Sequence, residues 1–188
     1  MPRRKVNARF AIAAVVFGAL AGLASGCLGE GATATQTFKC PSRESFTGEP
    51  EGGGANVQAV SAFMERRCGT LDCHGSALRP MRLLGRYGLR DPAQHNVTGG
   101  AATTAAEIDE NYAAVCNVEP EQMDKAAADF GQSAEKLLIL QKARGVEGHK
   151  GGAIVVQGTP GDDCLLGWLR GDKLSSVAPR CQEAIGGL

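Results

Sequence analysis

Seven cysteines set the strongest constraint on how this 188-residue chain can fold. One of them, Cys27, directly follows an apolar segment near the N-terminus, and the other six lie between residues 40 and 181. Six thiols can pair as three disulfides in 15 ways, or two thiols can serve another purpose while four pair in three ways. Both totals are even, so the cysteine count leaves both arrangements open.

The stretch before Cys27 predicts export. Residues 3–5 are positively charged, and residues 10–23 form a 14-residue apolar segment. A helix needs about 20 apolar residues to cross a bilayer core, so this segment is too short for a membrane span. We therefore expect residues 1–26 to be a signal peptide.

The end of this peptide, Leu-Ala-Ser-Gly-Cys at residues 23–27, resembles the lipobox of bacterial lipoproteins. The resemblance implies cleavage after residue 26 and acylation of Cys27 with fatty acids such as palmitate. The protein is then anchored by lipid to the cell envelope, at the outer membrane or at the periplasmic face of a membrane. An ordinary signal peptide with an unrelated cysteine is the alternative.

The charges of the mature chain argue against nucleic acid as a partner. Four of the 20 basic residues and none of the 20 acidic residues lie in residues 1–26, which leaves the rest of the chain with a net charge of −4. Nucleic-acid binders need clustered Lys and Arg to neutralise phosphates. The sequence also lacks the motifs of nucleotide-binding enzymes, serine hydrolases and zinc proteases. We expect a monomer that is neither an enzyme nor a nucleic-acid binder.

Residues 27–55 are expected to form a flexible tether. They are rich in Gly, Thr, Ser, Pro and Glu, and Phe38 and Phe46 are almost their only large apolar side chains. Such a composition buries too little surface to offset the chain entropy lost on folding. Cys40 is the exception, because a cysteine within a tether suggests that this point is fixed to the domain. Residues 56–188 are enough for one small hydrophobic core.

This domain is expected to be mainly α-helical, with long loops and disulfide staples. Apolar residues recur at helical spacing, and Thr104 with Glu107 forms a predicted capping box. Helices are predicted over residues 57–67, from Thr104 to Pro120, over residues 121–129, from Ser133 to Gly145 and from Thr159 to Gly171. The helix after Ser133 is apolar on every side and should be deeply buried. Residues 153–157 have strand character but are too few and too isolated for a sheet.

Residues 68–74, Cys-Gly-Thr-Leu-Asp-Cys-His, concentrate the chemistry of the sequence. This motif resembles that of c-type cytochromes, in which each of two thiols adds to a vinyl group of haem and the following histidine ligates iron. The usual motif has two residues between the cysteines; this one has four, a spacing found in some multihaem cytochromes. Alternatively, Cys68 and Cys73 form a disulfide beside an unrelated His74, or contribute to a zinc site.

Two further segments extend the resemblance. Residues 147–152, Glu-Gly-His-Lys-Gly-Gly, precede a predicted helix that ends in Trp-Leu before a glycine. This pattern is similar to that of secreted cytochrome-c-like domains of myxobacteria and planctomycetes, and residues 68–90 resemble a variant in myxobacterial cytochrome-c-like lipoproteins. Over residues 57–171 the resemblance implies a cytochrome-c-like fold whose C-terminal helix packs on its N-terminal helix. It also implies that Cys68 and Cys73 bind haem c covalently.

A haem at this motif needs iron ligands. His74 is the expected first ligand, and His and Met are the usual second ligands in c-type centres. His149 is preferred, because it lies in the glycine-flanked segment that matches the family, and Met123 is second. Met81 is a further candidate, although a methionine more often fills a core or lies on the surface. His95 lies in a polar loop and is expected to be exposed.

If the two cysteines of the motif carry haem, four remain to pair. Cys164 and Cys181 flank the last predicted helix and the terminal segment, so we expect them to pair with each other. Cys40 is then left to pair with Cys116, which would tie the tether to the domain.

Four arginines between residues 79 and 90 recur at steps of three and four: Arg79, Arg82, Arg86 and Arg90. A proline and two glycines among them argue against a continuous helix. They are interpreted as a solvated face or, alternatively, as a source of one or two ligands for the haem propionates.

The expected function is single-electron transfer by a monohaem c-type cytochrome-like lipoprotein, between redox partner proteins of the cell envelope. The alternative is a haem-free, disulfide-stapled surface lipoprotein that acts as an interaction or structural domain. The alternative predicts a Cys68–Cys73 bridge, whereas haem attachment requires that the two sulfurs are not joined.

Overall fold

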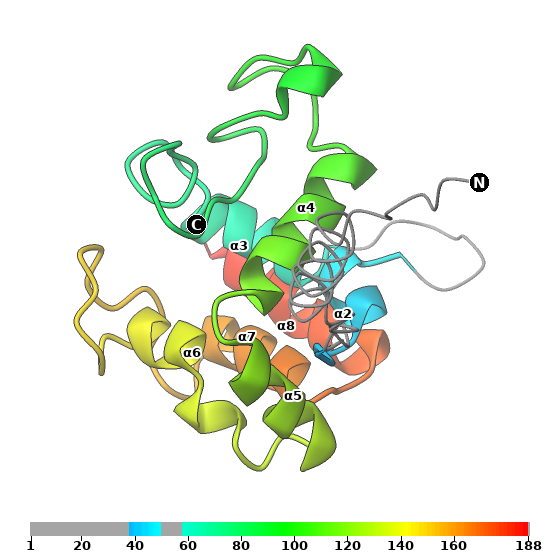
Figure 1. Ribbon diagram of the computed structural model, residues 1–188, viewed down its shortest axis with the longest axis vertical. Helices are drawn as coiled ribbons and strands as arrows, with labels where there is room; N and C mark the ends of the chain where they lie inside the picture. The colour runs from blue at the N-terminus through cyan, green and yellow to red at the C-terminus, as the bar shows by residue number, and fades with distance from the viewer. Residues whose placement is uncertain (1–37, 50–57, 188) are drawn as a thin grey trace, which may run out of the picture. The chain divides into compact units, whose positions relative to one another are not determined.

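The computed structural model describes residues 38–49 and 58–187 (Figure 1). The expected signal peptide, its lipidation site Cys27 and the remaining parts of the expected tether lie outside the described residues. The described residues, 38–49 and 58–187, belong to one compact unit. No helix in the described part is both long enough and apolar enough to span a membrane.

The described residues form seven α-helices and two short 3-10 helices, without a β-strand. The α-helices are α2 (Arg43–Thr47), α3 (Val60–Arg67), α4 (Ala105–Cys116), α5 (Pro120–Ala128), α6 (Leu138–Ala143), α7 (Pro160–Leu169) and α8 (Leu174–Gly186). The 3-10 helices are η2 (Pro92–Gln94) and η3 (Ala134–Lys136). The prediction of a mainly α-helical domain is confirmed.

Two helices begin where the local sequence signals place them. At the start of α4, Thr104 Oγ1 accepts the backbone N–H of Glu107, and the Glu107 carboxylate accepts the backbone N–H of Thr104, so the predicted capping box is formed. Pro160 begins α7 as predicted, whereas Pro120, expected to end the helix from Thr104, is the first residue of α5, and α4 already ends at Cys116. Proline suits the first position of a helix because a backbone N–H would have no helical partner there.

The helix predicted over residues 133–145 is instead two shorter pieces, η3 and α6. They are separated by Leu137, whose backbone is extended with ψ 133°. The carboxylate of Glu119 accepts the backbone N–H of Leu138 at the start of α6, so a distant side chain defines this helix start. Leu137 and Leu140 are buried but Leu138 is only partly buried, so the expected burial on every side is wrong.

The tether expected over residues 27–55 is also corrected, because residues 38–49 belong to the folded unit. Phe46 on α2 is fully buried, and its ring centroid lies 5.0 Å from that of Trp168 and 5.5 Å from that of Tyr112. Burial of one such side chain contributes about 1.5–3 kcal/mol, which helps to offset the entropy of ordering a short segment. The average hydrophobicity of residues 27–55 is low, so it does not reveal that Phe46 anchors residues 38–49 in the core.

The sequence signals do not predict α8, because Pro179 lies inside it. A proline within a helix removes one backbone hydrogen bond and usually bends or ends the helix. Here Leu174, Val177 and Cys181 on one face are buried, and α8 packs along α7 and α3. Tertiary contacts therefore hold a helix that local preference opposes.

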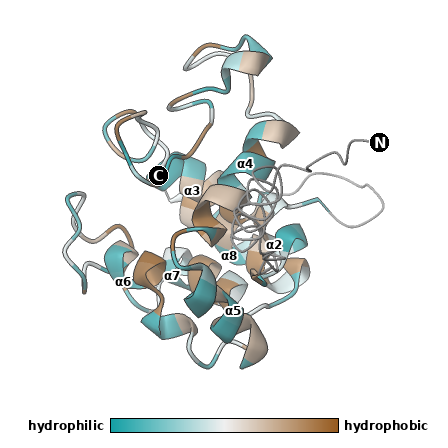
Figure 2. Ribbon diagram, viewed as in Figure 1, coloured by the Kyte–Doolittle hydropathy of each residue, from teal (hydrophilic) through white to brown (hydrophobic). Residues whose placement is uncertain are grey.

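The core is built around α7. Trp168 is fully buried, as are the α7 residues Leu165 and Leu169, and α3 contributes Phe63 to the same cluster. Figure 2 shows hydrophilic and hydrophobic residues alternating along the helices, as expected when each helix has one buried face. The core therefore positions the end of α3, from which the cysteine and histidine motif begins.

Two disulfides staple this core, and both were predicted. Cys164 and Cys181 join α7 to α8 with a Cα–Cα distance of 4.8 Å, and Cys40 joins Cys116 at the end of α4 with a Cα–Cα distance of 5.8 Å. Cys40 and Cys116 are separated by 76 residues, so their bond closes a long loop of the unfolded chain.

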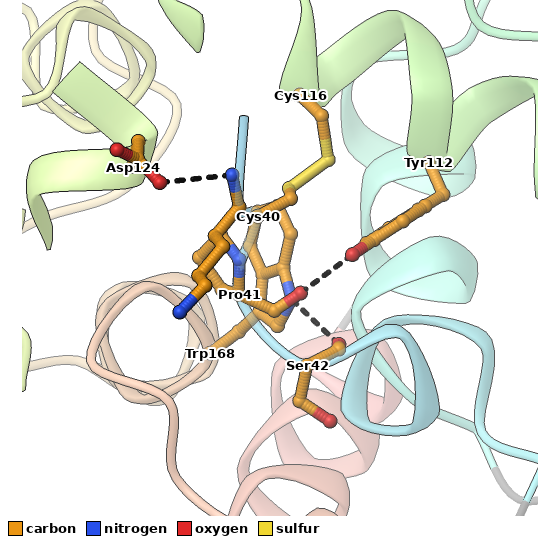
Figure 3. Close-up of a disulfide and its surroundings, with 8 residues drawn as sticks. Cys40, Pro41, Ser42, Tyr112, Cys116, Asp124 and Trp168 are labelled. Carbon is orange, nitrogen blue, oxygen red and sulfur yellow. Dashed lines mark hydrogen bonds between the residues drawn. A yellow bond between two sulfur atoms is a disulfide. The ribbon is translucent and has the colours of Figure 1, made fainter. Parts of the chain in front are cut away.

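Hydrogen bonds reinforce the Cys40–Cys116 disulfide (Figure 3). The Tyr112 hydroxyl donates to the carbonyl oxygen of Pro41 at 2.8 Å, and the indole N–H of Trp168 donates to the carbonyl oxygen of Ser42 at 3.0 Å. The backbone N–H of Lys39 donates to Asp124 at 3.0 Å. The segment before α2 is thus fixed to α4, α5 and α7.

Candidate functional site

The cysteine and histidine motif forms a compact loop that starts at the end of α3. We define the Cys-His loop as residues 68–75. The backbone N–H of Cys68 donates to Met64 in the last turn of α3 at 2.7 Å. Within the loop, the N–H of His74 donates to the carbonyl oxygen of Cys68 at 2.8 Å, and the N–H of Cys73 donates to Thr70 at 2.9 Å. These bonds place both thiols and the imidazole on one short turn.

Three glycines hold the Cys-His loop against the following chain. A Cβ atom at Gly75 would lie 2.1 Å from the carbonyl oxygen of Gly69 and 2.8 Å from the Cα atom of Gly88. A Cβ atom at Gly88 would also lie 2.1 Å from the Gly69 oxygen. Only glycine permits this approach of three backbone segments. Sequence reasoning did not assign these residues a role, although the glycine after each of Cys68 and His74 was the available signal.

His74 is oriented by a backbone carbonyl. Its Nδ1 atom lies 2.9 Å from the carbonyl oxygen of Met81, and the backbone N–H of Leu83 donates to the carbonyl oxygen of His74 at 2.8 Å. Because a carbonyl oxygen only accepts, Nδ1 is the donor in this bond, and in the neutral imidazole the lone pair is then on Nε2. Metal-ligating histidines commonly use this second-shell bond, which fixes the tautomer and the direction of the ring.

His149, the preferred second ligand in the sequence, lies beside His74. The centroids of the two rings are 6.0 Å apart and the ring planes differ by 15°. The Nδ1 atom of His149 lies 3.0 Å from the carbonyl oxygen of Gly152 and donates to it. The fold therefore brings together two half-buried imidazoles that are 75 positions apart, each with its Nδ1 held by a backbone carbonyl.

Cys68 and Cys73 are free thiols in the structure, and both are partly buried. Burial raises the pKa of the Cys68 thiol to about 12, the nearby Cys73 adds to the rise, and the positive charge of Arg67 opposes it. The disulfide that the haem-free alternative predicts between these two cysteines is not formed here.

The other candidate ligands do not join this pair. The side chain of Met123 is buried in the hydrophobic core, with 1% of its surface exposed. Met81 takes part through its carbonyl oxygen, and its side chain packs against the edge of the core. His95 is exposed, as expected, and its backbone has a positive φ of 51°.

The four arginines after the Cys-His loop do not act as one group. Arg90 is buried and forms a bidentate ion pair with Glu107, with N–O distances of 2.7 and 2.8 Å, so it is not available for a haem propionate. Arg79 donates to the carbonyl oxygens of Asp72 and Cys73 and supports the Cys-His loop. Arg82 and Arg86 are exposed, which agrees with the interpretation as a solvated face.

Glu107 is the centre of the buried ion pair. Burial alone would raise the pKa of this carboxyl, but hydrogen bonds from Arg90 and from the backbone of Thr104 and Asp91 outweigh burial and lower the pKa from 4.5 to about 2. Arg90 also donates to two backbone carbonyls, at 2.8 and 3.1 Å. This network closes the loop between Arg90 and α4.

A cavity of about 700 Å³ lies next to the Cys-His region, between the segment of Met81 and Leu84 and one face of α4. Neither the two thiols nor the two imidazoles line it. Asn111 also lines it; its amide oxygen accepts the backbone N–H of Leu84 at 2.6 Å, and its amide nitrogen donates to the Leu84 carbonyl at 2.7 Å. The cavity is therefore separate from the paired histidines.

Among residues 38–49 and 58–187, no three His, Cys, Asp or Glu side chains lie close enough together to hold a metal ion, so these residues do not form the zinc site that was an alternative for the Cys-His motif.

No protein-family model, curated protein or solved structure matches the chain. Functional inference therefore depends on the geometry of the Cys-His loop and His149.

Proposed function

We propose that this protein is a monohaem c-type cytochrome-like lipoprotein that transfers single electrons in the cell envelope. Cys68 and Cys73 would hold the haem covalently, and His74 and His149 would ligate its iron. A bound haem c supplies a one-electron redox centre. Lipid on Cys27 would keep the protein at a membrane surface, close to its redox partner proteins.

The paired imidazoles carry this proposal. Two imidazoles that ligate one metal ion each turn a ring nitrogen, not a ring face, towards that ion. The His74 and His149 rings are stacked with their centroids 6.0 Å apart, so both are close enough to serve one iron once each turns its Nε2 atom towards it. Both rings also keep Nδ1 on a backbone carbonyl, which in the neutral imidazole leaves the lone pair on Nε2, as a ligand requires.

The two free thiols fit covalent attachment. Each thioether forms when the S–H of a cysteine adds across the C=C bond of one vinyl group, so both sulfurs must be free of a disulfide. Cys68 and Cys73 meet this requirement and lie on the same loop as His74. The other four cysteines of the described residues are joined in two disulfides, so none of them competes with Cys68 or Cys73 for the haem.

The order of the helices also supports a cytochrome-c-like fold. The Cys-His loop follows α3 directly, α4 to α6 make up the middle region, and the C-terminal helix α8 packs on α3. This is the order that the sequence resemblance implies. Ligation by two histidines would leave iron without an open position for a substrate, which favours electron transfer over catalysis.

The mass of the native protein tests the proposal. Protein purified from cells with a working haem-attachment system should be heavier than the lipidated chain by one haem, and its alkaline pyridine spectrum should show a c-type haem. The haem should stay on the chain after denaturation, whereas the double variant C68S/C73S should release it. A native protein with the mass of the bare lipidated chain and with Cys68 joined to Cys73 would instead support the haem-free interaction domain.

A further inference from the structure

Arg67 has an unusual environment beside the Cys-His loop. It is the last residue of α3 and directly precedes Cys68. Its Nε atom is buried and has no hydrogen-bond partner among the described residues. Its Nη2 atom reaches the carbonyl oxygen of Ile154 at 3.4 Å, which is long for a hydrogen bond. Buried polar atoms are nearly always paired, so this guanidinium needs an explanation.

The position of the guanidinium connects the two sides of the candidate haem site. Ile154 belongs to the segment that follows His149, and both side chains approach the same glycine: a Cβ atom at Gly151 would lie 3.3 Å from the His149 ring and 3.5 Å from Ile154. In the chain, Arg67 directly precedes the attachment cysteine Cys68. Arg67 therefore connects the start of the Cys-His loop to the segment of His149.

Two other arginines, each paired with a carboxylate, show which kind of partner Arg67 lacks. Arg90 is paired with Glu107 in a bidentate arrangement, and Arg144 is paired in the same way with Asp162, at 2.6 and 2.9 Å. In both, the forked guanidinium matches the two oxygens of a carboxylate. No salt bridge of Arg67 is found within the described residues. A carboxylate is the partner that would satisfy it.

We infer that Arg67 binds a carboxylate of the porphyrin at this site, and so orients the haem and neutralises part of its charge. The inference rests on the proposed haem function. It differs from the sequence-based expectation, which looked for propionate ligands among residues 79–90. Arg67 is a positioning residue, because it acts on the carboxylate at the edge of the cofactor and not on iron.

The midpoint potential of the holoprotein is the first test. Reduction lowers the positive charge at iron, so a nearby guanidinium favours the reduced state, and R67Q should lower the potential. We expect about a tenfold change in the reduction equilibrium, which is about 59 mV for one electron. R67K should keep part of the effect. R66Q is the matched control, since Arg66 is exposed and lies over the Tyr87 ring with its Cζ 4.8 Å from the ring centroid.

A second test separates a carboxylate partner from a general charge effect. In the C68S/C73S background, binding of iron protoporphyrin IX is compared with binding of its dimethyl ester, which lacks the carboxylate charges. With Arg67 present, the free acid should bind about tenfold more tightly than the ester. In R67Q this ratio should fall close to one, whereas R66Q should retain it. Circular dichroism and thermal unfolding of each variant establish that the fold is kept.

The outcomes distinguish failure of the Arg67 role from failure of haem binding as a whole. An acid-to-ester ratio that is the same in R67Q and in the Arg67 parent overturns the role of Arg67 and leaves the haem proposal intact. Failure of the full chain to carry haem, together with failure of C68S/C73S to bind either porphyrin, overturns the proposed function and this inference with it.

Discussion

The buried ion pair between Arg90 and Glu107 allows a sharp test of the folded structure. Glu107 is fully buried and accepts hydrogen bonds from Arg90, from the backbone N–H of Asp91 and from both the N–H and hydroxyl of Thr104. The variant E107Q keeps the size of the side chain and removes its charge. Arg90 would then be a buried cation without a counter-ion.

The expected cost follows from this burial. Removing one partner of a buried ion pair destabilises a protein by about 3–5 kcal/mol. At roughly 2–4 °C per kcal/mol for a domain of this size, the thermal midpoint should fall by about 10 °C. The control is E110Q, an exposed residue on the same helix, which should change stability by less than about 0.5 kcal/mol.

Acid unfolding gives an independent reading of the same interaction. The pKa of Glu107 is about 2 in the folded protein, below its ordinary value of 4.5. The carboxylate therefore stabilises the fold above pH 4.5, and this contribution is lost as the pH falls from 4.5 towards 2. The difference between the two pKa values corresponds to about 3 kcal/mol. E107Q should lack this part of the acid transition. An E107Q protein within 1 kcal/mol of the parent, with an unchanged acid transition, would refute the reasoning.

Three further predictions concern the candidate site. In haem-free protein, Cys68 should react with iodoacetamide at pH 8 about 1000 times more slowly in the folded than in the unfolded state. The reason is that burial raises the pKa of Cys68 from 9.0 to about 12 and so lowers the fraction present as thiolate. Equal rates of labelling, measured by peptide mass, would contradict this burial. Gly75→Ala should cost about 3 kcal/mol in denaturant unfolding, since its Cβ would lie 2.1 Å from a carbonyl oxygen, whereas Gly148→Ala, with no atom within 4 Å, should be nearly neutral. His149→Ala should allow the holoprotein to bind added imidazole or carbon monoxide, read from its visible spectrum, and exposed His95→Ala should not.

Much of the fold could be predicted because several signals act over a few residues. The capping box of Thr104 and Glu107, and the proline that begins α7, depend on hydrogen bonds and backbone angles within one turn of helix. Local signals failed where distant groups intervene. A carboxylate from Glu119 begins α6, and packing against α7 keeps α8 helical through Pro179.

The candidate site shows the same division. The motif of residues 68–74 was visible in the sequence, and His149 was preferred from the glycines around it. The contact of Gly69 with Gly75 and Gly88, and the pairing of Arg90 with Glu107, were not predicted, because each joins segments whose approach depends on the whole chain path. Of the four arginines that their spacing suggested as an exposed basic face, Arg90 is therefore buried.

By itself, the sequence predicted the helical class and the chemical groups available for a cofactor, which depend on residue type and short-range spacing. It predicted the two disulfides only on the condition that Cys68 and Cys73 are set apart for haem, because the cysteine count left both arrangements open. Only the tertiary structure decided which groups meet: it places His149 beside His74 with the ring centroids 6.0 Å apart, orders the segment before α2 around Phe46, and leaves Arg67 Nε without a partner among the described residues. The physical reason is that burial and the pairing of distant side chains are set by how helices pack, and packing depends on contacts that no local pattern contains.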